Sequence, residues 1–284
     1  MSSATINLID KDLIGTTGAR PGAMGFLTDT TLCIGCKACE VACKQWNQLP
    51  MDDFGWTGHS YDNTNDLTAT TWRQVAFIEQ FGGDGNGRPT EMPPFQSHWL
   101  MMSDVCKHCV HAGCLEACPT GAIIRTEIDT VVVQQDICNG CGYCVPSCPY
   151  GVIDVSPTDW KAHKCTLCYD RSKEGLEPAC AKSCPTDSIQ FGPVDQLMER
   201  AKQRVAHLHE IGVESAYIYG DRAIGGTGGI DGDNAFFILT AEPEVYNLPA
   251  HPVLPQNKTG PAFLSTFGAA LALGMAAVAV LRGK

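Results

Sequence analysis

The spacing of the cysteines narrows the possible folds of this chain more than any other feature of its sequence. All 16 cysteines fall into four compact groups. The groups are Cys33-x2-Cys36-x2-Cys39-x3-Cys43, Cys106-x2-Cys109-x4-Cys114-x3-Cys118, Cys138-x2-Cys141-x2-Cys144-x3-Cys148 and Cys165-x2-Cys168-x11-Cys180-x3-Cys184. A thiol content this high indicates disulfides, zinc sites or iron–sulfur clusters.

Disulfides and zinc fit this pattern poorly. Residues 1–25 include four charged side chains and no continuous apolar stretch, so they predict no secretory signal peptide. Disulfide scaffolds are typically short secreted chains with dispersed cysteines. A zinc site takes two separated cysteine pairs, whereas the first and third groups each place four cysteines within eleven residues. A zinc-binding interaction scaffold stays open only as a non-redox alternative.

The third group has the spacing of ferredoxins that bind two cubes. Three cysteines two residues apart reach three irons of one [4Fe–4S] cube, and the fourth, before a proline, ligates the neighbouring cube. A Cys-Pro-x-x-small-Ile sequence recurs at 118–123, 148–153 and 184–189. The sequence therefore predicts four [4Fe–4S] clusters in an α+β fold of two tandem ferredoxin-like units. Because the clusters replace a hydrophobic core, we expect the metal-free chain to fold poorly.

The rest of the chain divides into segments around this cysteine-rich region. A hairpin is expected at Ile123–Ile128 and Thr130–Gln134. Asp195–Glu210 has apolar residues on one helical face, which favours core packing, with docking on a larger subunit as the alternative. The predicted organisation is an N-terminal extension at 1–25, a four-cluster region at 26–192 with an insertion at 44–105, a partner-docking helix, hairpin and proline-rich tether at 193–260, and a single transmembrane helix at 261–281.

The predicted transmembrane helix sets the expected cellular location. Residues 261–281 carry no charge, and at about 1.5 Å per residue they span roughly 31 Å, the thickness of a bilayer core. Arg282 and Lys284 follow the segment and Lys258 precedes it, so the positive-inside rule places the clusters on the extracytoplasmic side. Without its own signal peptide, the chain would be exported already folded with a partner. The alternative is a buried amphipathic helix.

The sequence contains no catalytic constellation. If all the cysteines ligate iron, no thiol is left as a nucleophile, and fully ligated cubes offer no open coordination site. His108 and His111, in the second group, are expected to hydrogen-bond to cluster ligands. Gly225–Gly229 lacks a Walker lysine and is interpreted as the loop of a hairpin between Ala216–Tyr219 and Phe236–Leu239. We therefore expect a non-catalytic electron carrier.

The charge distribution excludes a nucleic-acid partner. A net charge of −11 and a pI of about 5.1 would repel phosphates rather than attract them. Basic residues near the cysteines would instead raise the potentials of nearby clusters. These residues are Lys37, Lys107, Lys161, Lys164 and Arg171.

Several motifs around the cysteines carry a family resemblance. They are Cys33–Trp46, Cys106–Cys109, Gly113–Leu115, Lys164–Arg171, Glu177–Cys180 and Ala201–Ala206, together with the late glycines and the C-terminal apolar segment. These stretches resemble the iron–sulfur subunits of the molybdopterin oxidoreductase (dimethyl sulfoxide reductase) superfamily. Within it, they are most similar to the beta subunits of membrane-bound respiratory formate dehydrogenases. The resemblance extends from about Gly25 to Leu281.

The resemblance implies a pairing of the cysteine groups, the first with the fourth and the second with the third. The implied ligand sets are Cys33, Cys36, Cys39 and Cys184; Cys165, Cys168, Cys180 and Cys43; Cys106, Cys109, Cys114 and Cys148; and Cys138, Cys141, Cys144 and Cys118. It also implies electron entry from a molybdenum or tungsten catalytic subunit and exit to a membrane cytochrome b and quinone. The alternative within the superfamily is a nitrate, polysulfide or dimethyl sulfoxide reductase, with electrons running the other way.

Overall fold

The computed structural model describes residues 22–51, 55–58, 61–80, 98–221 and 232–282. Nearly all of the predicted N-terminal extension at 1–25 lies outside the described residues. The predicted loop at Gly225–Gly229 also lies outside them. The described fold is α+β, as expected, with four sheets and mostly short helices.

A four-stranded sheet joins distant parts of the chain. Its strand order is β8 (Ile189–Pro193), β1 (Met24–Asp29), β10 (Ala235–Leu239) and β9 (Tyr217–Tyr219). β1 pairs antiparallel with β8 and parallel with β10, and β10 pairs antiparallel with β9. The β9–β10 pair confirms the hairpin expected in this region. Since β10 is central and covered on both faces, its sequence is continuously apolar, whereas β1 is apolar over its first four residues and ends in Thr28 and Asp29.

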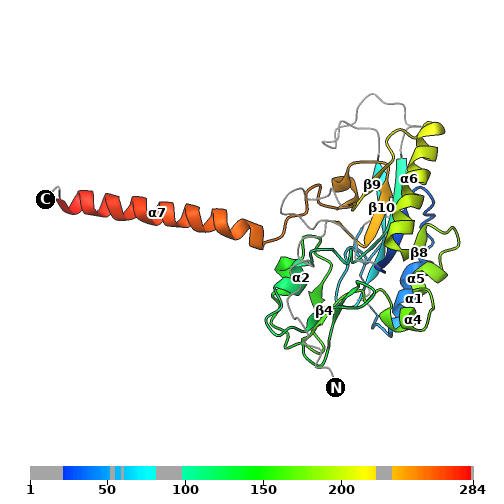
Figure 1. The fold of residues 1–284 in the computed structure, drawn as a ribbon, viewed down its shortest axis with the longest axis horizontal. Helices are drawn as coiled ribbons and strands as arrows, with labels where there is room; N and C mark the ends of the chain where they lie inside the picture. Colours follow the sequence, from blue (N-terminus) through cyan, green and yellow to red (C-terminus); the bar gives the residue numbers. More distant parts are fainter. Residues whose placement is uncertain (1–21, 52–54, 59–60, 81–97, 222–231, 283–284) are drawn as a thin grey trace, which may run out of the picture.

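Helix α6 (Val194–Glu210) covers one face of this sheet (Figure 1). Leu197 and Ala201 on α6 pack against Phe236 and Ile238 of β10, so the predicted helix is confirmed and its apolar face packs in the core. The alternate residues of β10 point to the opposite face, where Phe237 packs in a second apolar cluster.

The packing under α6 gives a stability prediction. Leu197 is 2% exposed, and its replacement by alanine leaves a cavity between helix and sheet. We expect Leu197→Ala to cost about 2–5 kcal/mol of unfolding free energy, measured by urea or thermal unfolding of the cluster-loaded chain. Gln203→Ala, at an exposed position of the same helix, is the control and should change stability by less than about 0.5 kcal/mol. Equal losses in both variants would contradict this packing.

The cysteine groups lie on or beside short helices that meet in two pairs. In the first pair, α1 (Ala38–Asn47) contacts α5 (Ala179–Lys182). Helix α4 (Tyr169–Lys173) comes directly before α5 in sequence. In the second pair, α2 (Gly113–Glu116) contacts α3 (Cys144–Ser147). Figure 1 shows α1, α4 and α5 together on one side of the body and α2 beside β4 on another. One two-helix unit is therefore inserted in sequence within the other, so the two units are nested and not in tandem as expected.

Three two-stranded sheets complete the body. β2 (Arg73–Gln80) and β3 (His98–Val105) pair antiparallel within the 44–105 insertion. β4 (Ile123–Arg125) and β5 (Val131–Val133) also pair antiparallel, which confirms the predicted hairpin with shorter strands. The third sheet pairs β6 (Asp154–Val155) with β7 (Ala162–His163).

The proline-rich segment after β10 is packed rather than extended. Pro243–Tyr246 forms a 3-10 helix, η2, and the side chains of Tyr246 and Leu248 are buried against the sheet face opposite α6. Leu254 packs between the short helices α2 and α3. This differs from the free tether expected from the prolines, because the apolar residues between them bury their side chains in the body.

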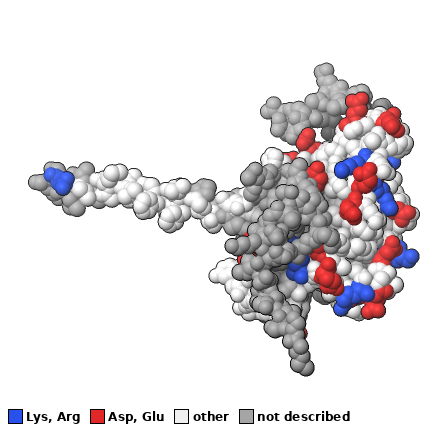
Figure 2. Space-filling view, in the orientation of Figure 1, with Lys and Arg blue, Asp and Glu red and all other residues white. Residues whose placement is uncertain are grey.

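Helix α7 (Gln256–Arg282) projects from the body (Figure 1), and Figure 2 shows it with almost no charge before its far end. The prediction of a transmembrane helix at 261–281 is nevertheless wrong: in the part of the chain that the structure describes, no helix is both long enough and apolar enough to span a bilayer. The helix begins with polar residues, and residues 261–281 include seven alanines and two glycines. Their small side chains gain little free energy on leaving water, which is the physical reason for the correction.

Candidate metal centres

Three cavities inside the body are each bordered by four cysteines. What we call the first site contains Cys33, Cys36, Cys39 and Cys184 and encloses about 290 Å³. The second site contains Cys43, Cys165, Cys168 and Cys180 and encloses about 270 Å³. The third site contains Cys106, Cys109, Cys114 and Cys148 and encloses about 350 Å³.

The remaining four cysteines form what we call the fourth site. Burial raises the pKa of the Cys144 thiol, and the thiols of Cys138, Cys141 and Cys118 raise it further. None of the sixteen cysteines forms a disulfide. The four sets are the same as those implied by the family resemblance, each with three cysteines from one group and one from its paired group. That each set ligates one cluster stays a prediction.

A tight backbone turn opens each group. The residue before the second cysteine has a left-handed conformation in all four, at Gly35 (φ 66°), His108 (φ 46°), Gly140 (φ 72°) and Leu167 (φ 57°). At Gly140 a Cβ atom would lie 1.9 Å from the carbonyl oxygen of Trp160, so only glycine fits. His108 and Leu167 adopt this unfavourable conformation with fully buried side chains, so the surrounding packing holds the turn in place.

Burial makes the thiolate form of several cysteines unfavourable unless a cation lies beside it. Burial raises the pKa of Cys39 to about 11, and it raises the pKa of Cys43 and of Cys114 to about 12. Thiols with such pKa values stay protonated at neutral pH unless a positive charge stabilises the thiolate. Iron supplies that charge, and the thiolate is the form that binds it. The donor sets therefore fit iron–sulfur clusters.

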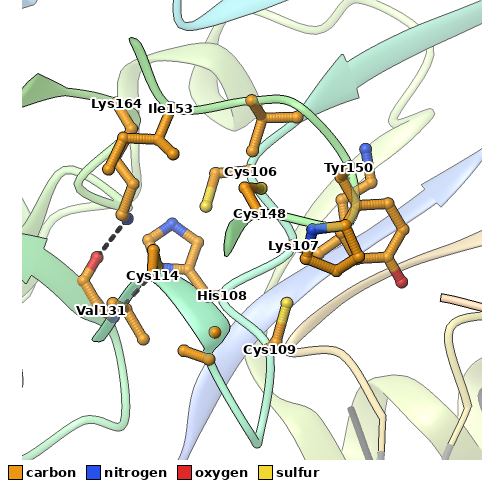
Figure 3. Close-up of a pocket in the computed structure, with 14 residues that line it drawn as sticks. Cys106, Lys107, His108, Cys109, Cys114, Val131, Cys148, Tyr150, Ile153 and Lys164 are labelled. Atoms are coloured by element: carbon orange, nitrogen blue, oxygen red, sulfur yellow. Dashed lines mark hydrogen bonds between the residues drawn. The ribbon is translucent and has the colours of Figure 1, made fainter. Parts of the chain in front are cut away.

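A histidine at the third site offers an unused donor. The Nδ1 atom of His108 accepts a hydrogen bond from the Val131 backbone N–H at 3.1 Å, so a neutral ring carries its proton on Nε2. Burial, with further contributions from Lys164 and Arg125, holds the pKa of His108 well below its usual range. The Nε2 atom is buried without a partner, and His108 borders the cavity among Cys106, Cys114 and Lys164 (Figure 3). It is therefore placed to donate to a cluster bound there.

An arginine that the sequence patterns do not single out borders the second site. The side chain of Arg73 is 1% exposed, and its NH2 atom lies 3.4 Å from the Cys180 sulfur. Its Nε atom is buried without a partner. Arg73 is far from every cysteine in sequence and belongs to no cluster motif, so the sequence gives no indication that it lies near a cluster site. Only the pairing of β2 with β3 brings it to the cavity.

The predicted basic residues and His111 occupy different environments. Lys164 is buried at the third site, whereas Lys107 is buried in an ion pair with Asp104 and lies 4.9 Å from the Tyr150 ring centroid. The others are placed nearer the surface. Lys37 pairs with Asp62, Lys161 donates to the Gln135 carbonyl, Arg171 stacks on Trp46, and His111 lies 3.9 Å from Glu116. The effects of these residues on cluster potentials stay predictions.

Comparisons with known proteins agree with this donor chemistry. Residues 97–194 match a family model described as a 4Fe-4S dicluster domain. The chain is 41% identical over 230 residues to the nitrate-inducible formate dehydrogenase iron-sulfur subunit of Escherichia coli (strain K12), covering 80% of this chain and 72% of that protein. It is 40% identical over 237 residues to the formate dehydrogenase iron-sulfur subunit of Haemophilus influenzae, covering 82% and 70%.

The resemblance extends to a second type of reductase at lower identity. A component of the anaerobic dimethyl sulfoxide reductase of Escherichia coli (strain K12) is 34% identical over 181 residues, covering 62% of this chain and 76% of that protein. The formate dehydrogenase subunits thus match more of this chain, and more closely. With its sixteen cysteines gathered in four sets, the chain belongs to the family of formate dehydrogenase iron–sulfur subunits, proteins that carry electrons on [4Fe–4S] clusters.

Proposed function

We propose that this chain is the electron-transfer subunit of a formate dehydrogenase, relaying electrons from a molybdenum or tungsten catalytic subunit toward a membrane cytochrome b and quinone. The observation that carries the proposal is a continuous row of four cysteine sites with an exposed thiol at each end. A [4Fe–4S] cluster bound at each site supplies one-electron transfer, at a potential set by hydrogen bonds, charge and solvent exposure.

The order of the sites follows from thiols that are close enough to affect one another's charge. Cys39 of the first site has Cys180 of the second as an electrostatic neighbour. Cys165 of the second site is a neighbour of Cys106 of the third. Cys114 of the third site is in turn a neighbour of Cys144 of the fourth. The sites therefore form one row from the first to the fourth.

The two ends of the row reach the surface. Cys36 in the first site and Cys141 in the fourth are the two exposed cysteines of the sixteen. Ile34, beside Cys36, is 58% exposed, and Tyr143, beside Cys141, is 62% exposed. We assign the catalytic subunit to one end of the row and the electron acceptor to the other.

Two finer parts of the proposal concern the electron acceptor and the cellular location. The cytochrome b acceptor is supported by the family resemblance. The extracytoplasmic location, with export of the folded chain alongside its partner, was argued from charges flanking the predicted transmembrane helix. Among the described residues, no helix can span a bilayer, so this argument no longer applies. Cell fractionation with protease treatment of intact cells, followed by detection of a tag on this chain, tests the location. Digestion without lysis would support export, and complete protection would contradict it.

Formate is the expected reductant of the assembled complex. We would purify the complex anaerobically through a tag on this chain, add formate, and follow cluster reduction by electron paramagnetic resonance. Reduction at the rate of turnover is expected, since electrons released by formate oxidation enter the row from the catalytic subunit. Dithionite, added to a second sample, measures the clusters that any reductant can reach.

The possible outcomes separate three alternatives. Reduction by dithionite but not by formate would support the electron-carrier role and reject the formate assignment. Reoxidation of dithionite-reduced clusters by dimethyl sulfoxide in the same complex would favour a reductase of the type represented by the lower-identity relative. A colourless protein that contains zinc and no iron would reject the proposed function altogether.

A further inference from the structure

In the part of the chain that the structure describes, two buried cations lie between neighbouring cysteine sites without a carboxylate partner. They are Arg73, between the first and second sites, and Lys164, between the second and third. Arg73 is 1% exposed and Lys164 is 2% exposed. Among the described residues, neither forms an ion pair with Asp or Glu. An unpaired buried charge is costly, so something else near these side chains must supply negative charge.

Arg73 connects the first two sites through short contacts. Its NH2 atom lies 3.4 Å from the sulfur of Cys180 in the second site. Its NH1 atom lies 3.3 Å from the Ser103 hydroxyl, and that hydroxyl lies 3.2 Å from the sulfur of Cys39 in the first site. One guanidinium therefore touches a ligand of one site directly and a ligand of the other through a single hydroxyl group.

The packing of Arg73 keeps its charge between the two sites. The guanidinium carbon lies 4.8 Å from the centroid of the Phe26 ring, and NH1 also donates to the Ser103 carbonyl at 3.3 Å. The remaining electrostatic neighbours are thiols from the same two sites, including Cys165 and Cys43. The side chain is thus held by fixed contacts beside thiols of both sites, and among the described residues it forms no ion pair with a carboxylate.

Lys164 occupies the corresponding place between the second and third sites. Its Nζ atom donates to the Val131 carbonyl at 2.5 Å, as Figure 3 shows, and to the Cys165 carbonyl at 3.0 Å. The thiols that act on its charge are Cys106 and Cys114 of the third site and Cys165 of the second. Lys164 thus borders the cavity of the third site and also bonds to the backbone of Cys165, a ligand of the second site.

Other basic residues of the body show that carboxylates are the usual partners. Lys107 is equally buried but pairs with Asp104. Arg204 pairs with Asp29 at 2.9 Å and Lys37 with Asp62 at 2.7 Å. A carboxylate next to Arg73 or Lys164 would cancel the positive charge there. Its absence leaves the thiolate ligands of two sites as the countercharge for each cation.

We propose that Arg73 and Lys164 are shared countercharges, each raising the reduction potentials of two adjacent clusters. A fixed cation favours the reduced state because reduction adds one negative charge to the cluster. Arg73 acts on the first and second sites, and Lys164 acts on the second and third. This inference rests on cluster binding at the proposed sites and does not depend on formate as the donor.

The test is a dithionite potentiometric titration of the anaerobic complex, monitored by electron paramagnetic resonance, with iron measured in every sample. Arg73→Gln should shift two of the four midpoint potentials to more negative values and leave two unchanged. Lys164→Gln should also shift two, and one cluster should be affected in both variants. Arg73→Lys keeps the charge and should restore most of the shift. Arg200→Gln removes the same charge at an exposed position and should change none.

Several results would overturn the proposal. With iron content intact, it fails if Arg73→Gln shifts no potential, one potential, or all four equally. It also fails if the midpoint potentials in Arg73→Lys shift as much as those in Arg73→Gln, because equal shifts would result from changed packing and not from the loss of charge. If Arg73→Gln loses iron, Lys164→Gln and Arg73→Lys decide by the same criteria. A wild-type complex without iron would instead reject the proposed function itself.

Discussion

Removal of iron from the purified chain is expected to unfold most of its body. The largest apolar cluster includes Cys39, Cys106, Cys165 and Cys180 among its buried members, and the second includes Cys109, Cys114 and Cys144. Without metal, these residues would lose the cluster around which they pack. Because metal binding supplies much of the folding free energy of a small metal-rich core, the metal-free chain should lose the packing that holds its short helices together.

Hydrogen exchange and far-ultraviolet circular dichroism during treatment with a chelator measure this effect. The packing of α6 on the sheet contains no cysteine, so amides of α6 should keep their protection longest. Amides around the second and third cysteine groups should exchange first. The prediction fails if the iron-free chain still melts cooperatively with native circular dichroism. Chain treated with chelator already saturated with iron is the control for non-specific effects.

Single cysteine replacements are expected to remove one cluster each, in a pattern that crosses the sequence groups. Cys184 belongs to the fourth group in sequence, but in the structure it completes the first site. Cys184→Ala should therefore abolish the same paramagnetic signal as Cys36→Ala, and Cys43→Ala should abolish the signal lost in Cys165→Ala. Iron content should fall from about sixteen to about twelve atoms per chain in each variant, since each site holds one cube.

Matched controls keep this experiment informative. Lys182→Ala changes an exposed residue close to Cys184 and should retain all four signals. Loss of the Cys165 signal in Cys184→Ala would show that ligands are drawn from one sequence group only and would contradict the proposed sets. Where a variant retains too little iron to compare signals, the serine variant at the same position keeps a possible oxygen ligand and allows the comparison.

Local patterns predicted much of the fold and the cofactor. Cysteines two or three residues apart lie on a single turn, so their spacing indicates the cluster type before any tertiary contact is known. The β4–β5 hairpin, the β9–β10 pair and α6 were likewise predicted from short apolar patterns. In each case the signal extends over fewer than about twenty residues, a range in which backbone geometry and side-chain periodicity dominate.

Segments whose structure depends on distant partners were predicted less well. The proline-rich segment was expected to be extended, but Tyr246 and Leu248 are buried against residues of the distant sheet. The alanine-rich C-terminal helix was expected to cross a membrane. An uncharged stretch indicates how long a helix can be but not how apolar it is. Among the described residues, no helix is both long enough and apolar enough to span a bilayer.

The sequence by itself determined the cofactor chemistry of this protein, because the cysteine spacing places its ligands through local turns. Only the tertiary structure decided which distant residues surround each cluster site. Arg73 contacts Cys180 across 107 positions of the chain, through the β2–β3 hairpin. No local pattern encodes such a contact, since it results from the packing of whole elements against one another. The electrostatic environment of the cluster sites, unlike their ligands, is therefore a property of the folded chain.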